Sequence, residues 1–241
     1  MKNFQIKQRY IDTQVRYWQE NKNAIEKVEF KETHEKKDKP FITISREYGA
    51  GAFELAEKIT DIINKKYKST PEWCAFDKEL LDKIGSDLGL SESLAKVLTE
   101  SARKKMTDFI QTSFSSFPPQ VHIYNKLVEN IRTLAINGNA VIVGRTGNII
   151  TRDMIKGFHV RLVAPLSYRV NRMSTVYNLA NKEAEKIIKE KENQRNSFIK
   201  EFVKFDNADP LNYHLIINLG LMSIDEAALI IVNSMEDCGY L

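Results

Sequence analysis

Short apolar runs alternate with helical periodicity from residue 40 onward. Near-continuous apolar runs predict five strands, at residues 41–44, 73–76, 140–143, 160–163 and 215–218. Apolar residues three or four positions apart predict six helices, the fifth of them broken, at residues 53–66, 78–88, 91–112, 120–137, 167–204 and 223–237. Strands that are apolar at nearly every position are typical of parallel sheets covered by helices on both faces. The pattern therefore predicts an α/β fold around a five-stranded parallel sheet.

Residues 1–39 differ from the rest of the chain because they are polar and rich in Lys, Gln, Asn and Glu. Their apolar residues, among them Tyr10 and Trp18, are spaced as in one or two helices. We therefore predict an N-terminal helical arm at residues 1–39 and a main domain at residues 40–241. The arm either packs on the main domain or binds a partner, for example as a homodimer.

Composition narrows the classes of function. The net charge of +4 suits small anionic ligands and is too low for a typical nucleic-acid-binding protein. No apolar run approaches the ~20 residues that span a bilayer, and no signal peptide is apparent, so we expect a cytoplasmic protein without membrane attachment.

Two cysteines make no disulfide framework, and the four histidines lack metal-ligand spacing. We expect no metal site built by the protein, and we interpret Cys74 as a small buried apolar residue.

The first strand leads into a loop with two glycines and then into an amphipathic helix, which is the layout of a phosphate-binding loop. The loop amides and the helix N-terminus favour negative charge at one point. Against the standard pattern G-x-x-x-x-G-K-[ST], Gly51 is the second glycine, Arg46 stands at the first, and Ala52 stands at the lysine. The layout is present, but its usual cation is missing.

Polar residues follow the first four predicted strands. They are Ser45 to Glu47, Asp77 with Lys78, Gly144 to Asn148, and Arg169 with Arg172. In open α/β sheets, ligands bind at the carboxyl ends of the strands. We therefore predict a shared anion site there, the alternative being that these side chains only reach solvent.

Together these segments resemble the cytidylate kinase-like proteins, relatives of the bacterial cytidylate kinases among the nucleoside monophosphate kinases. The resemblance covers about residues 40–235 and rests on four motifs in order, at residues 42–51, 76–80, 141–148 and 160–169. It implies a three-layer P-loop nucleoside triphosphate hydrolase fold with a helical lid at about residues 166–205.

The resemblance also implies roles for the matching residues. The donor ATP, with Mg²⁺ held mainly by its phosphates, would bind at Ser45, Gly49, Ala50, Gly51 and Ala52. The acceptor nucleotide would bind at Asp77, Lys83, Arg145 and Glu192. The predicted catalytic residues are three arginines of the lid that the resemblance implies, Arg169, Arg172 and Arg195, together with Arg46, which we add because of its place in the loop.

Ala52 is the main departure from the family pattern. Loss of the lysine costs on the order of 2 to 4 kcal/mol of transition-state stabilisation. Arg46 is the nearby cation that could compensate, unless it pairs with Glu47 or another carboxylate. Glu54 stands where a threonine is usual, so it either holds Mg²⁺ through water or repels the phosphates. Glu192 replaces an aspartate, and we interpret His214, at the start of a strand, as structural.

Three functions remain open. The first is a nucleoside monophosphate kinase-like phosphotransferase from ATP to CMP or a related small acceptor, which the lid arginines favour because a guanidinium holds two phosphate oxygens at once. The second is a weak or inactive nucleotide-binding regulator with a degenerate loop. The third is a kinase for another small hydroxyl or phosphate compound.

Overall fold

Five parallel strands form the centre of the molecule in the computed structural model, which describes residues 39–77, 122–199 and 205–241. The strands are β1 Phe41–Arg46, β2 Cys74–Phe76, β3 Ala140–Val143, β4 Gly157–Val163 and β5 Leu215–Asn218. Their order in the sheet is β2-β3-β1-β4-β5, so β1 lies in the middle. The predicted parallel sheet is confirmed, and β4 begins earlier than expected.

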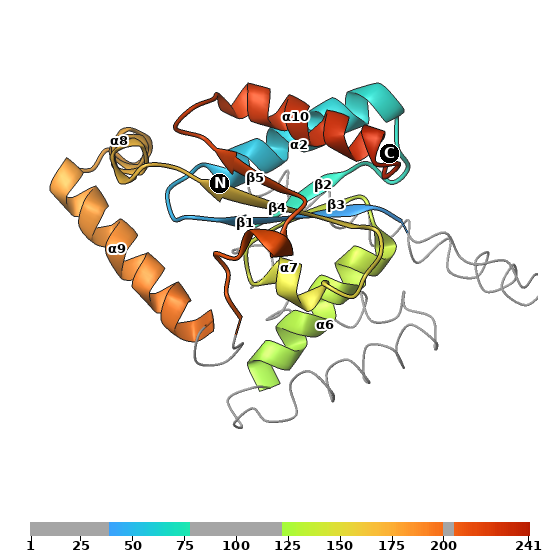
Figure 1. The fold of residues 1–241 in the computed structure, drawn as a ribbon, viewed down its shortest axis with the longest axis horizontal. Coiled ribbons are helices and arrows are strands. Elements are labelled where there is room, and N and C mark those ends of the chain that lie inside the picture. The colour runs from blue at the N-terminus through green and yellow to red at the C-terminus, as the bar shows by residue number, and fades with distance from the viewer. Residues whose placement is uncertain (1–38, 78–121, 200–204) are drawn as a thin grey trace, which may run out of the picture.

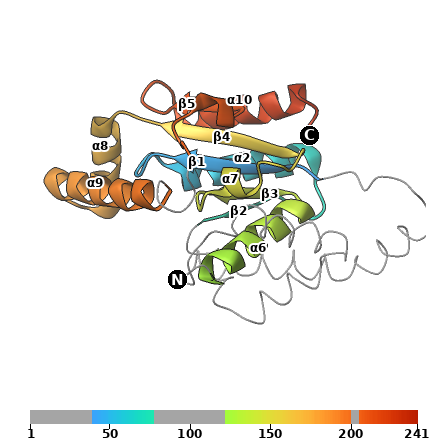
Figure 2. The same ribbon diagram turned by 60° about the horizontal axis from the view of Figure 1, so that its bottom comes forward.

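Helices cover both faces of the sheet (Figures 1 and 2). Helices α2 Ala52–Tyr67 and α10 Ile224–Asp237 pack together on one face, while α6 His122–Asn137 and α7 Gly147–Ile150 lie on the other. The apolar stripe of α2, which includes Leu55, Ile59 and Ile63, is fully buried against the sheet. The three-layer architecture is confirmed. Helix α7 was not predicted because four residues are too few to show a periodicity.

Two helices extend beyond the carboxyl ends of the strands (Figure 1). They are α8 Leu166–Tyr177 and α9 Asn181–Phe198, and they lie within the predicted lid. The predicted break is confirmed, since α8 ends at Tyr177 and its C-cap residue, Asn178, has a left-handed backbone with φ of 53°. Val170 and Met173 of α8 pack with Ile188 of α9 in a small apolar cluster, and Tyr48 of the loop after β1 packs against it. The lid is therefore joined to this loop by apolar contacts.

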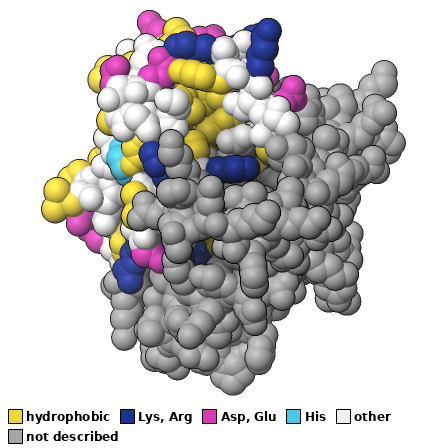
Figure 3. Space-filling view, turned by 90° about the vertical axis from the view of Figure 1, so that its right-hand side faces the viewer, with side chains coloured by type: hydrophobic (Ala, Val, Ile, Leu, Met, Phe, Trp, Pro, Cys, Tyr) yellow, Lys and Arg dark blue, Asp and Glu magenta, His cyan; other side chains and the backbone are white. Residues whose placement is uncertain are grey.

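Several predictions fall outside the described residues: the arm at residues 1–39 apart from Lys39, the helices at residues 78–88 and 91–112, and Lys83. Among the helices that the structure describes, none is both long and apolar enough to cross a bilayer. Viewed from the right of Figure 1, the described Lys and Arg side chains lie scattered among hydrophobic, acidic and neutral ones (Figure 3).

Candidate functional site

The glycine loop turns from β1 into α2 underneath the lid helix α8. Gly49 and Gly51 have φ of 86° and 91°, a region that other residues rarely adopt. A Cβ atom on Gly49 would lie 3.1 Å from Met173 Cγ of α8, which is tighter than an ordinary contact. Gly51 is the N-cap residue of α2, so the loop ends at the helix N-terminus as predicted. Ala50 and Ala52 are buried beside the two glycines.

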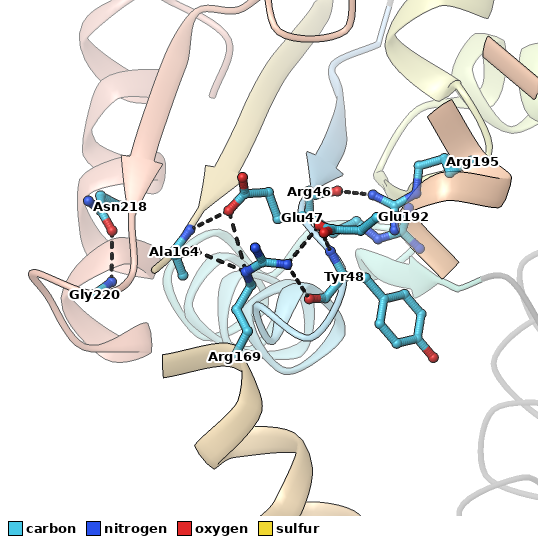
Figure 4. A network of polar contacts seen from close by, with 9 residues as sticks. All are labelled: Arg46, Glu47, Tyr48, Ala164, Arg169, Glu192, Arg195, Asn218 and Gly220. Carbon is cyan, nitrogen blue, oxygen red and sulfur yellow. Dashed lines mark hydrogen bonds and ion pairs between the residues drawn. The ribbon is translucent and has the colours of Figure 1, made fainter. Parts of the chain in front are cut away.

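Arg169 joins the lid to the loop in a buried network (Figure 4). Its Nε donates to the Ala164 carbonyl at 3.0 Å, and its Nη1 donates to the Tyr48 carbonyl at 3.2 Å and to Glu192 Oε1 at 2.7 Å. The same Glu192 oxygen accepts from the Tyr48 backbone N–H at 3.2 Å. The predicted catalytic residue Arg169 and the predicted acceptor residue Glu192 thus form an ion pair between α8 and α9.

Glu47 belongs to the same network. Its Oε2 accepts from the Ala164 N–H at 2.8 Å and lies 3.6 Å from Arg169 Nε (Figure 4). Beside it, Asn218 Oδ1 at the end of β5 accepts from the Gly220 N–H at 2.9 Å. The Glu47 carboxylate is therefore directed toward β4 and the lid, and it holds the ends of neighbouring strands together.

Arg46 lies on the opposite side of β1, toward β3. A Cβ atom on Gly144, the residue after β3, would lie 1.6 Å from Arg46 Nη1, so the guanidinium rests directly on this glycine. Arg195 of α9 donates from Nη1 to the Arg46 carbonyl. Burial, followed by the positive charges of Arg195 and Arg145, lowers the pKa of Arg46 to about 10, while Tyr48 and Asp77 act in the opposite direction.

Arg145 reaches this place through an unusual turn. Gly144, Arg145 and Thr146 have φ of 78°, 52° and 54°, so three consecutive residues are left-handed. This conformation costs roughly 1–2 kcal/mol at a residue with a Cβ, and such strain concentrates at functional sites. Its effect here is to bring Arg145 beside Arg46.

Arg161 is a site residue that the sequence reasoning missed. It lies in β4 level with Ser45 of β1, and its Nη1 approaches Ser45 Oγ at 3.5 Å. Its guanidinium lies 5.8 Å from the centre of the Tyr213 ring, within cation–π range. Burial, and then Arg161 and Arg169, lower the pKa of Arg195, while Glu192 raises it. A single charged residue inside an apolar strand was the signal that could have revealed Arg161.

We call Arg46, Arg145, Arg161 and Arg195 the arginine cluster. Ser45, predicted to bind the donor, lies at its edge and donates from Oγ to Asn207 Oδ1 at 3.2 Å. Asp77, which follows β2, is close enough to raise the pKa of Arg46. Residues at or just after the ends of β1, β2 and β3 therefore lie near one place together with Arg161 of β4 and Arg195 of α9, whereas Arg169 and Arg172, predicted for the same site, lie outside the cluster.

Arg172 of α8 lies apart from this cluster, and its side chain contacts the glycine loop. Its Nη2 donates to Glu54 Oε2 at 2.6 Å in the first turn of α2. A Cβ atom on Gly51 would lie 2.8 Å from Arg172 Nε. The lid thus covers the loop with one arginine, Arg172, and is fastened to it by another, Arg169.

The remaining predictions concern metal ligands and structural residues. Among the described residues, no three His, Cys, Asp or Glu side chains gather as a metal site. His214 Nδ1 accepts from the His159 N–H at 3.0 Å and its Nε2 contacts the Tyr240 hydroxyl at 3.2 Å, which fits a structural role. Cys74 is buried in β2, as expected.

A family model and one solved structure agree with this architecture. Residues 41–220 match the model of the cytidylate kinase-like family. An uncharacterized protein from Eubacterium ventriosum has a similar structure, with a TM-score of 0.63 and 21% identity over 83% of this chain and 99% of that one. Shikimate kinase from Bacteroides thetaiotaomicron is less similar, with a TM-score of 0.43 and 12% identity over 84% and 99%. No curated protein matches the chain. The family match covers all five strands, the glycine loop and helices α8 and α9, and the chain therefore belongs to the cytidylate kinase-like family.

Proposed function

We propose that this protein transfers the terminal phosphoryl group of ATP to CMP or to a related small phosphate acceptor. The observation that carries the proposal is the arginine cluster beside the glycine loop. Burial, and then repulsion by Arg195 and Arg145, lower the pKa of Arg46 to about 10, so its charged form is disfavoured at this place. An anionic acceptor bound among these guanidiniums would offset that repulsion. Phosphoryl transfer depends on such positioning and charge neutralisation more than on covalent chemistry by the protein.

The two substrates would occupy different sides of β1. The donor phosphates would lie at Gly49 to Ala52, where the left-handed glycines and the N-terminus of α2 fit an anion. The acceptor phosphate would lie toward β3, near Arg46, Arg145 and Arg195. Mg²⁺ would neutralise phosphate charge, and because the described residues form no carboxylate cluster, the nucleotide phosphates and water would supply most of its ligands.

A second candidate is a nucleotide-binding regulator with little or no turnover. The absent loop lysine and the ion pairs of the lid arginines favour it. Arg169 is paired with Glu192 at 2.7 Å and Arg172 with Glu54 at 2.6 Å, so phosphates would have to compete with carboxylates for both. The two candidates differ in whether ADP forms when an acceptor is added.

The test is an assay of acceptor-dependent ADP release. The purified full chain is incubated with ATP, Mg²⁺ and a panel that includes CMP, other nucleoside monophosphates, shikimate and non-nucleotide phosphate monoesters. Turnover with one phosphate acceptor supports the proposal. Binding of ATP by calorimetry without turnover on any member of the panel would favour the regulator, and turnover only with shikimate would indicate a hydroxyl-compound kinase.

A further inference from the structure

The lid places an arginine over the loop position that lacks its lysine. Arg172 extends from α8 to the loop, where a Cβ atom on Gly51 would lie 2.8 Å from its Nε and 3.1 Å from its Cζ. Gly51 directly precedes Ala52, the position that a standard loop fills with lysine. The guanidinium of Arg172 therefore lies against the backbone at the start of α2.

Glu54 holds this guanidinium in place. Its Oε2 accepts from Arg172 Nη2 at 2.6 Å, and it lies in the first turn of α2, two residues after Ala52. About half of the Glu54 side chain is exposed, so the ion pair adds little to the free energy of unfolding. Its effect is to orient Arg172. An arginine has five N–H donors, so the ion pair uses only part of the donor capacity of this guanidinium.

Arg46 occupies a different place from Arg172. Its guanidinium rests on Gly144 after β3, and Arg145 and Arg195 are the nearby cations that lower its pKa. Gly144 is the first residue after β3, and Gly51 is the last residue of the loop that follows β1. The two arginines therefore lie at different places around the end of β1. Arg172 is the one that contacts the glycine loop.

We infer that Arg172 replaces the missing loop lysine: its guanidinium contacts the terminal phosphates of the donor, and Glu54 is its positioning residue. The inference rests on the proposed function, because it requires the loop to bind the phosphate chain of ATP. A planar guanidinium can hold two phosphate oxygens, as a lysine cannot. Because Arg172 belongs to the lid, the cation reaches the phosphates only while the lid covers the loop, which couples charge neutralisation to lid closure.

The first test measures donor binding without turnover. Calorimetry compares the magnesium complex of a non-hydrolysable ATP analogue with AMP, which lacks the terminal phosphates. Arg172→Gln should weaken binding of the analogue about 10- to 100-fold, as expected for hydrogen bonds to a charged group, and change AMP binding less than twofold. The matched control is Lys189→Gln, which breaks the exposed lid pair with Glu185, also 2.6 Å long.

The second test asks whether Glu54 acts through Arg172. Glu54→Gln should weaken binding of the analogue in the wild-type background and have no further effect in the Arg172→Gln background. Arg172→Lys should keep part of the affinity because it keeps the charge. Melting temperatures show which variants fold. If Arg172→Gln does not fold, Arg172→Lys is compared with the wild type instead.

The outcomes separate this inference from the proposed function. Equal affinity of wild type and Arg172→Gln for the analogue would overturn the role of Arg172, even if the wild type releases ADP. Binding that depends on Arg172, without turnover on any acceptor, would leave this inference standing and overturn the kinase proposal. If the wild type binds neither the analogue nor tripolyphosphate, both fail.

Discussion

At the scale of single residues, the site is made of arginines whose surroundings differ. Arg169 is buried and bonded to carbonyls and to Glu192, so it fastens the lid to the loop. Arg46 lies among like charges, and burial together with these charges lowers its pKa to about 10. Arg172 is more exposed and has a carboxylate partner, Glu54. Arginine side chains at three positions therefore differ in role according to their environment. Arg169 connects the lid helices to the loop, Arg46 is proposed to bind an anion, and Arg172 contacts the loop.

Gly144 offers a test of the position of Arg46. In Gly144→Ala the new Cβ would overlap Arg46 Nη1, at 1.6 Å, and displace the guanidinium. Turnover should fall at least about 10-fold, since a misplaced charged group loses most of its transition-state contact. Gly239→Ala is the matched control, because Gly239 also has positive φ, of 72°, and nothing lies within 4 Å of its Cβ position.

Both glycine variants adopt the same left-handed backbone, so both should lose roughly 1–2 kcal/mol of stability. Only Gly144→Ala should lose activity. Equal turnover in the two variants, measured on protein that is folded by circular dichroism, would contradict the placement of Arg46 in the acceptor site.

Arg161 is expected to contribute to acceptor binding. Arg161→Gln removes a positive charge beside Ser45 and Arg195 and should raise the KM of the acceptor about 10-fold or more, with little change in the KM of ATP. Arg152→Gln is the control, because Arg152 is an exposed arginine outside the cluster. An acceptor KM that is the same in both variants would argue that Arg161 only packs on Tyr213.

At the scale of elements, the lid and the glycine loop form one connected unit. Apolar contacts join Tyr48 to the α8–α9 cluster, and the Glu192 carboxylate accepts hydrogen bonds from Tyr48 and from Arg169. Any movement of α8 and α9 away from the loop would break these polar bonds together, because one oxygen of Glu192 serves both donors. Such a movement would therefore be coupled to the conformation of the loop.

Glu192→Gln should loosen this unit. The neutral amide keeps an acceptor oxygen but removes the charge that pairs with buried Arg169, so local opening should become easier by about 1–2 kcal/mol. Hydrogen exchange at α9 and at the Tyr48 amide should become faster, while exchange in β1 and β4 stays the same. Glu190→Gln, in an exposed pair whose atoms are 3.9 Å apart, is expected to leave exchange unchanged. Slow exchange in both variants would show that apolar contacts alone hold the lid.

At the scale of the whole molecule, a pair of histidines connects three strands of the sheet. Thr43 Oγ1 and His159 Nδ1 are 2.7 Å apart between β1 and β4, and His214 at the start of β5 bonds the His159 N–H. Burial, and then the charge of His214, lower the pKa of His159 to about 4. These groups connect the three strands β1, β4 and β5, and His159 lies two residues before Arg161 of the arginine cluster in β4.

The histidine pair predicts the acid stability of the fold. His159 binds a proton more weakly in the folded chain than in the unfolded one, where its pKa is about 6.5. Protonation therefore favours unfolding, and stability should fall as the pH drops from about 6.5 to about 4, by up to ~3 kcal/mol from this group. Urea unfolding at several pH values measures the slope. His159→Asn should make the slope shallower, and an unchanged slope in a folded variant would exclude His159 as its origin.

The sequence by itself determined the five-stranded sheet, helices α2, α6 and α10, the break between α8 and α9, and the glycine loop. These features depend on local signals: runs of apolar residues, helical spacing, and glycines before a helix. The shared site at the strand ends was also predictable, because parallel strands bring their carboxyl ends to one edge. Arg46 and Arg145 were therefore named before their contacts were known, and Arg195 was named from the family resemblance.

Only the tertiary structure decided which arginine lies where. Long flexible side chains take their places from neighbours that are distant in sequence, and those neighbours depend on strand order and on the position of the lid. Register between β1 and β4 brings Arg161 to Ser45, and the packing of α8 on the loop brings Arg172 to Gly51 and Glu54. Periodicity in the sequence carries no information about such pairings, so the cation that serves the lysine-less loop became visible only in the folded chain.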